Sequence, residues 1–110
     1  MSIIIAGTVR TPPEQLASLK PHMLAMLAAS RAEDGCLTYS YGEDVADLGL
    51  IRVFEVWRDG AALEAHFKAP HMAVWRAAWT EHGVSDRRLT RYEVAAEQTI
   101  WGGPARRRSL

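Results

Sequence analysis

Two short segments of this chain are apolar at consecutive positions, where a half-buried strand would alternate apolar with polar residues. Residues 3–10 begin with three isoleucines, and residues 50–57 carry apolar side chains on both alternating sets, interrupted only by Arg52 and Glu55. Short runs rich in β-branched and aromatic residues favour strands. Because successive side chains of a strand point to opposite faces, a sheet that contains these two strands needs a cover on both faces.

The segment between these strands predicts a helix and then a further strand. Thr11, Pro12 and Glu14 match a helix start in which the threonine hydroxyl and the glutamate carboxylate cap free amides. We expect this helix to end near Gly35. Alternating tyrosines then predict a two-faced strand over residues 36–42. The buried stripe of the helix is predicted to comprise Leu16, Leu19, Met23, Leu27 and Ser30, with Met26 beside it.

Two shorter helices and a last strand complete the predicted elements. Asp59 can cap the first of these helices, and the second follows Pro70 and ends at Gly83. The inward face of the first is expected to carry Leu63, His66 and Phe67. With a last strand over about residues 88–100, the order predicts an α+β sandwich, in which one mainly antiparallel sheet has helices on one face.

Helices on one face leave the other face of the sheet bare. An uncovered face with two doubly apolar strands exceeds the roughly 300–600 Å² apolar patch of an ordinary monomer. We therefore expect a homodimer that covers this face, and such obligate interfaces commonly bury more than about 2,000 Å². With 110 residues the chain has room for one domain, which we place at residues 1–101, followed by a disordered basic tail at residues 102–110.

Composition excludes several classes of function. Thirteen basic side chains balance thirteen acidic ones, so no overall positive field attracts phosphates and no nucleic-acid partner is expected. The single cysteine, Cys36, cannot form an internal disulfide, which fits a reducing compartment. No segment approaches the roughly 20 apolar residues that span a bilayer, and the start of the chain does not resemble a signal peptide. We expect a cytoplasmic protein without membrane contact.

The densest group of chemically capable side chains lies between residues 55 and 79. It comprises Glu55, Trp57, His66, His71, Trp75 and Trp79. His66 shares the inward stripe of its helix, so a neutral imidazole there could act as a base near pH 7. From composition alone, a histidine satisfied by a backbone carbonyl or by Glu55 is the commoner outcome. Likewise, indoles spaced four apart are more often core than ligand wall, although they suit a flat aromatic guest.

The partners of Glu55 and the spacing of the histidines limit the chemistry that the sequence predicts. Glu55 is costly to bury within an apolar strand, and His66, His71, Arg52 and Tyr39 are its candidate partners. A metal site is not expected, because the spacing of His66 and His71 matches no familiar ligand pattern and no third ligand is evident. Nor does the sequence contain a glycine-rich phosphate loop or a nucleophile elbow.

Two stretches resemble the antibiotic biosynthesis monooxygenase domain, including its quinol monooxygenases. They are EDGCLTY, from Glu33 to Tyr39, and FEVWRDGAALEAHFKAPHM, from Phe54 to Met72. The second is the more specific, since its E-x-W, its spaced histidine and its Pro-His pair recur together in that family. The resemblance covers about residues 3–100. It implies a ferredoxin-like fold whose sheet pairs with a second subunit into a dimeric α+β barrel, with a pocket between sheet and helices.

The resemblance also implies an activity, namely cofactor-free oxygenation of phenolic or quinol substrates by O2. His66 would then be the base, and His71 and Tyr39 would orient a phenolic oxygen. Trp57, Trp75 and Trp79 would hold the ring and exclude water, with Glu55 as a further binding residue. The chain contains no asparagine, so it lacks the Asn-Trp-His arrangement of haem-degrading relatives.

Two alternative functions remain open at this stage. Fold similarity does not determine a reaction, because relatives of this kind include isomerases of small oxygenated metabolites. A dimer that binds a small aromatic molecule without transforming it fits the same residues.

Overall fold

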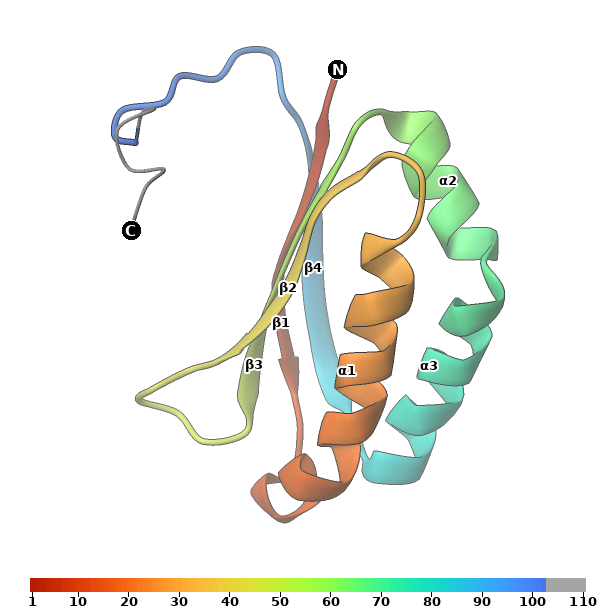
Figure 1. The fold of residues 1–110 in the computed structure, drawn as a ribbon. Coiled ribbons are helices and arrows are strands. Elements are labelled where there is room, and N and C mark those ends of the chain that lie inside the picture. The colour runs from red at the N-terminus through yellow and green to blue at the C-terminus, as the bar shows by residue number, and fades with distance from the viewer. Residues whose placement is uncertain (103–110) are drawn as a thin grey trace.

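The computed structural model describes residues 1–102 of the chain and shows one antiparallel sheet with helices on one face (Figure 1). The strand order is β2-β3-β1-β4. This confirms the predicted α+β, ferredoxin-like fold class. In chain order the elements are β1 (Ile3–Arg10), a short 3-10 turn (Pro13–Gln15), α1 (Leu16–Arg31), β2 (Cys36–Glu43), β3 (Leu50–Trp57), α2 (Gly60–Lys68), α3 (Pro70–His82) and β4 (Ser85–Glu93).

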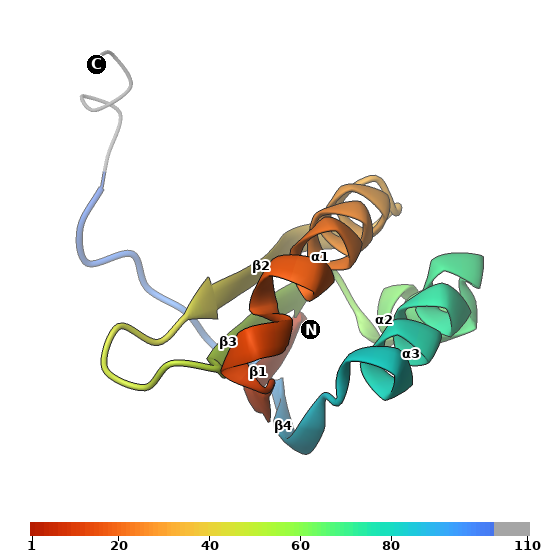
Figure 2. The ribbon, with the colours of Figure 1, turned by 90° about the horizontal axis from the view of Figure 1, so that it is seen from below.

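The helices form a layer whose two halves differ in their distance from the sheet. α1 packs against β2 and against α3, whereas α3 contacts α1 more than it contacts the sheet (Figure 2). The main core lies between this layer and the strands, where Ile3, Leu19, Trp57 and Leu63 are buried. The looser packing of α3 leaves space between this helix and the sheet, and the cavity described below occupies it.

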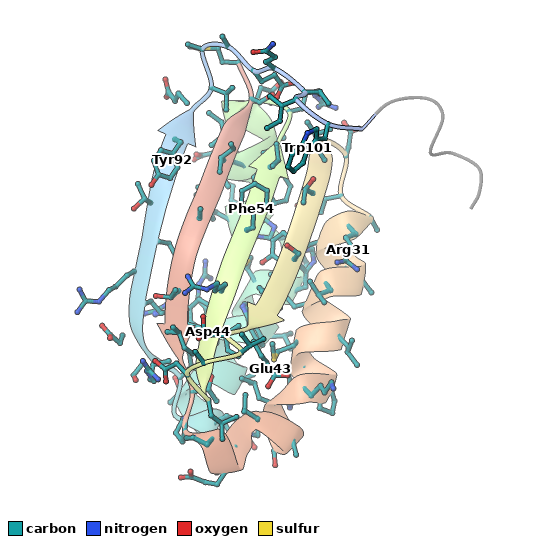
Figure 3. All side chains as sticks on the ribbon, turned by 90° about the vertical axis from the view of Figure 1, so that its left-hand side faces the viewer. Arg31, Glu43, Asp44, Phe54, Tyr92 and Trp101 are labelled. Carbon is teal, nitrogen blue, oxygen red and sulfur yellow. The ribbon has the colours of Figure 1, made fainter. Side chains whose placement is uncertain are left out.

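No helix covers the opposite face of the sheet, which Figure 3 shows. Phe54 on β3 is 42% exposed and Tyr92 on β4 is 52% exposed. Trp101 extends on the same side of the molecule (Figure 3). We refer to this face as the open face. None of the helices among residues 1–102 is long and apolar enough to cross a bilayer.

The last strand is shorter than the sequence predicted. β4 ends at Glu93, which pairs with Ile3 at the start of β1, and Val94 makes one more hydrogen bond to Ser2. No further pairing with β1 follows among the described residues, so the predicted continuation of the strand to residue 100 is wrong. The predicted tail falls almost wholly on residues 103–110, outside the described part of the chain.

The predicted start of the first helix is also wrong. Pro12 is extended, with φ −55° and ψ 130°, and Thr11 makes no side-chain capping bond. The cause is Pro13, because a residue that precedes proline is driven out of the helical region. The helix therefore begins later, through the 3-10 turn. In contrast, Asp59 accepts the predicted capping bond from the amide of Ala62, and Gly83 ends α3 with φ 72°.

Candidate active site

A cavity of about 400 Å³ lies between α3 and the sheet. Its walls are mainly apolar and aromatic, as is typical of small-molecule sites. Of the seven side chains that the sequence predicted for a site, five line it. These are Tyr39, Glu55, His66, Trp75 and Trp79. Trp57 and His71 do not.

The local fold of α2 determines where His66 points. The Asp59 cap starts the helix, and the 3.6-residue repeat then places Ala62, Leu63 and His66 on its buried face. The imidazole is 1% exposed and lies between two rings, with centroids 4.5 Å from Trp57 and 5.4 Å from Tyr39. Phe67, predicted for the same inward stripe, is half exposed but still lines the cavity.

Glu33 holds both histidines of this region. Its Oε2 lies 2.6 Å from His66 Nδ1 and 2.7 Å from His71 Nε2. The glutamate comes from the turn that follows α1, 33 and 38 positions before these residues. Our site prediction did not include Glu33. No local pattern connects it to the histidines, and only its place in the EDGCLTY stretch drew attention to it.

The contact with Glu33 defines the tautomer of His66. Because a carboxylate accepts, Nδ1 donates its hydrogen and the lone pair of the neutral ring resides on Nε2. Among residues 1–102 no side-chain hydrogen bond occupies Nε2, and the ring lines the cavity. Burial lowers the pKa of His66 and outweighs the opposing effect of Glu33. The imidazole is therefore neutral at pH 7 and can accept a proton.

The same three side chains are the described group that could hold a metal ion, since their ligand atoms lie within 4.8 Å of one another. No third ligand was evident from the sequence, and Glu33 supplies a candidate for it. Ligands bonded to one zinc ion at about 2.0–2.1 Å are separated by more than about 3 Å. The observed contacts of 2.6 and 2.7 Å are hydrogen-bond distances, so the group would have to open to admit an ion.

Glu55 has a different partner from those predicted. Its Oε1 accepts a hydrogen bond of 2.9 Å from Trp57 Nε1, two residues along the same strand face. Burial raises the pKa of Glu55 to about 7. Trp57 is 0% exposed, so it cannot form the substrate wall that the sequence predicted. Its role is to pack the core and to hold Glu55.

Two tyrosines and two tryptophans form the polar and aromatic parts of the cavity wall. The hydroxyls of Tyr39 and Tyr41 lie 3.0 Å apart, and burial raises the pKa of both phenols. They therefore remain neutral and can donate hydrogen bonds. Tyr41 stacks on Trp75 at 5.6 Å, and Trp75 meets Trp79 edge to face at 5.8 Å. This wall suits a flat ring.

Comparisons with known proteins address the fold and the family of this chain. The solved structure of a Deinococcus radiodurans protein, described provisionally as an antibiotic biosynthesis monooxygenase, superposes with a TM-score of 0.83 at 29% identity and covers 93% of this chain and 100% of that one. The uncharacterized protein sll1783 of Synechocystis is 29% identical over 98 residues, which are 89% of this chain and 67% of that protein.

A Mycobacterium tuberculosis protein, Rv0793, described provisionally as a monooxygenase, is 38% identical over 65 residues, or 59% of this chain and 63% of that protein. The matches thus span about two thirds of the length of each of these two curated relatives. A family model described as antibiotic biosynthesis monooxygenase matches residues 2–78. This match covers most of the chain and the fold agrees with it, so the chain belongs to the antibiotic biosynthesis monooxygenase family.

Proposed function

We propose that this protein is a cofactor-independent monooxygenase that oxidises a small phenolic or quinol substrate with O2. The observation that carries the proposal is the Glu33–His66 hydrogen bond at the wall of the cavity. It supports an imidazole whose Nε2 is unprotonated at neutral pH and faces an apolar space. The family to which the chain belongs supports the reaction class.

In the proposed reaction, His66 Nε2 removes the proton of a phenolic hydroxyl. The resulting electron-rich anion transfers electrons to O2, and a bond forms between one oxygen atom and a ring carbon. The O–O bond then breaks and the second oxygen atom leaves as water. For a quinol, the overall products are a hydroxyquinone and water, and the substrate supplies all four electrons. His66 returns its proton to the departing oxygen.

The remaining cavity residues position the substrate. Trp75 and Tyr41 offer a stacked aromatic wall for the ring, and the Tyr39 hydroxyl can donate a hydrogen bond to the phenolic oxygen. A volume of about 400 Å³ accommodates one or two fused rings. Tight packing around His66 limits access of water, which keeps the anion reactive.

We further infer that two copies pair through the open face of the sheet. This inference rests on the half-exposed rings of Phe54 and Tyr92 and on the apolar residues of β1 and β3 that share the face with them. An apolar face of this kind is rarely left in contact with water. Pairing of two sheets would give the α+β barrel that the sequence resemblance implies.

The test is O2 consumption in air with a panel of hydroquinones and naphthols. We expect the protein to accelerate uptake with at least one of them, and His66→Gln to lower the rate by about 10²–10⁴-fold. His22→Gln is the matched control, because His22 lies on α1 and does not line the cavity; this variant should retain full activity.

Other outcomes would overturn the proposal. Tight binding of these rings without any product would identify a binding protein. Conversion of a ligand at an equal rate without O2 would identify an isomerase. Normal turnover by His66→Gln would eliminate the proposed base.

A further inference from the structure

Three arginines, all exposed to solvent, line the cavity together with its apolar walls. Arg76 comes from α3, and Arg87 and Arg91 come from β4. Arg87, Leu89 and Arg91 occupy alternate positions of β4, so their side chains point to the face of the sheet that carries the cavity. Among the described residues, the carboxyl group that lines the cavity with them is Glu55.

Only one of these three arginines forms an ion pair among the described residues. Arg91 pairs with Glu93 at 3.4 Å, and Arg88, which does not line the cavity, pairs with Asp86 at 2.9 Å. Within residues 1–102, no carboxylate oxygen lies within 4.0 Å of Arg76 or Arg87. The cavity therefore has two cationic groups whose charge nothing in the described chain neutralises.

Arg87 is also held in place. Its guanidinium carbon lies 4.3 Å from the centroid of the Trp79 ring, a cation–π distance. Stacking uses the flat face of the guanidinium and leaves the N–H groups at its edge free to donate. A planar donor group fixed in this way matches the two oxygens of a carboxylate.

The charge balance of the cavity favours an anionic guest. Burial raises the pKa of Glu55 to about 7, so this carboxyl group is largely protonated below neutral pH and offsets little of the positive charge. The three arginines are exposed, so they lie at the solvent side of the cavity, where an anionic group of a guest can pair with them while its ring contacts the apolar wall. A neutral phenol would form no ion pair with these arginines.

We propose that the cavity selects an aromatic substrate that bears a carboxylate, and that Arg87 is the residue that recognises this group, assisted by Arg76. The aromatic nature of the guest rests on the proposed function, whereas the preference for an acid follows from the arginines. The substrate class is then an acidic phenol or quinol, with the hydroxyl toward His66.

Binding, measured separately from turnover, tests the proposal. We would titrate naphthol and the corresponding hydroxynaphthoic acid into the protein by calorimetry. The acid should bind at least about tenfold more tightly, and Arg87→Met should weaken acid binding by about tenfold while naphthol affinity changes less than about twofold. Naphthol binding also shows that the variant is folded. Arg88→Met, one residue away and already paired with Asp86, should change neither affinity.

Arg87→Lys separates charge from shape. Lysine keeps the positive charge but loses the planar fork and much of the stacking on Trp79, so we expect it to restore only part of the preference for the acid. Rising salt should weaken acid binding and leave naphthol binding unchanged.

Two results would overturn the inference. One is equal affinity of the unmodified protein for naphthol and the acid. The other is a loss of affinity for both ligands in Arg87→Met, which would show a packing role only. The test is independent of the proposed activity, because a preference for the acid without O2 uptake would contradict the monooxygenase and leave the recognition of acids intact.

Discussion

The two faces of the sheet are built from the same strands, yet they are completed in different ways. On the helix-covered face, Trp57 is 0% exposed and His66 packs against it. On the open face, Phe54 of the same strand is 42% exposed. The covered face is completed within one chain and encloses the cavity, whereas the open face keeps exposed rings and has no helix over it. Under our proposals, one face carries the chemistry and the other carries association.

The largest effect on stability is expected from a substitution in the core beneath the helices. Trp57→Ala should lower the free energy of unfolding by about 3–5 kcal/mol, because a fully buried ring is lost and Glu55 loses its hydrogen bond. The measurement is urea unfolding at several protein concentrations. The loss should be the same at every concentration, since the contact lies within one subunit. A loss below about 1 kcal/mol would contradict the difference between the faces.

The pH dependence of stability tests whether Glu55 is buried on the helix-covered face. Its pKa rises from 4.5 to about 7 on folding, so between these values the folded state binds more protons than the unfolded state. The free energy of unfolding should therefore fall as pH rises through this window, by about 3 kcal/mol in total. Glu55→Gln should remove this contribution. Identical pH profiles for the two proteins would show that Glu55 is not buried as described.

Glu33 should matter for catalysis more than for stability. Glu33→Gln removes the charge that raises the pKa of His66, so the pH below which kcat/KM declines should move lower. We also expect kcat to fall by at least about tenfold, because Nδ1 is held less firmly. An unchanged pH profile with a normal kcat would show that Glu33 does not position the base. Asp34→Asn, on the exposed side of the same turn, is the control.

The smallest expected effect on the subunit itself comes from the open face. Phe54→Asp should leave the circular dichroism of the fold unchanged and stability within about 1 kcal/mol, when both proteins are compared as monomers. It should convert the proposed dimer into a monomer, as measured by light scattering after gel filtration. A protein that is monomeric before the substitution would contradict the role assigned to this face.

Local patterns predicted most of the fold. The Asp59 cap, the left-handed Gly83 and the apolar residues on both sides of β3 each depend on residues close in sequence, and the structure contains all three. The sequence prediction was wrong at element boundaries, where an adjacent residue or the paired strand decided the outcome. Pro13 prevented the helix start at Thr11, and the pairing of β4 with β1 ends at Glu93, opposite Ile3.

The candidate site was less predictable, because its key contact is between distant segments. A histidine on the inward face of α2 was visible from helical spacing. Its partner Glu33 was not, since it lies 33 positions earlier, in the turn after α1, and meets His66 only through the tertiary fold. Sequence reasoning instead offered a backbone carbonyl or Glu55 as the partner of this histidine. The indole N–H of Trp57 donates to Glu55, so this carboxyl group has a partner without a histidine.

The most direct test of the central claim is nitrogen NMR of the His66 imidazole at pH 7. We predict a neutral ring with hydrogen on Nδ1, bound to Glu33, and an unprotonated Nε2 that faces the cavity. His66→Gln identifies the resonances by their disappearance. A ring that carries hydrogen on Nε2, or on both nitrogens, would contradict the claim that this side chain is the base.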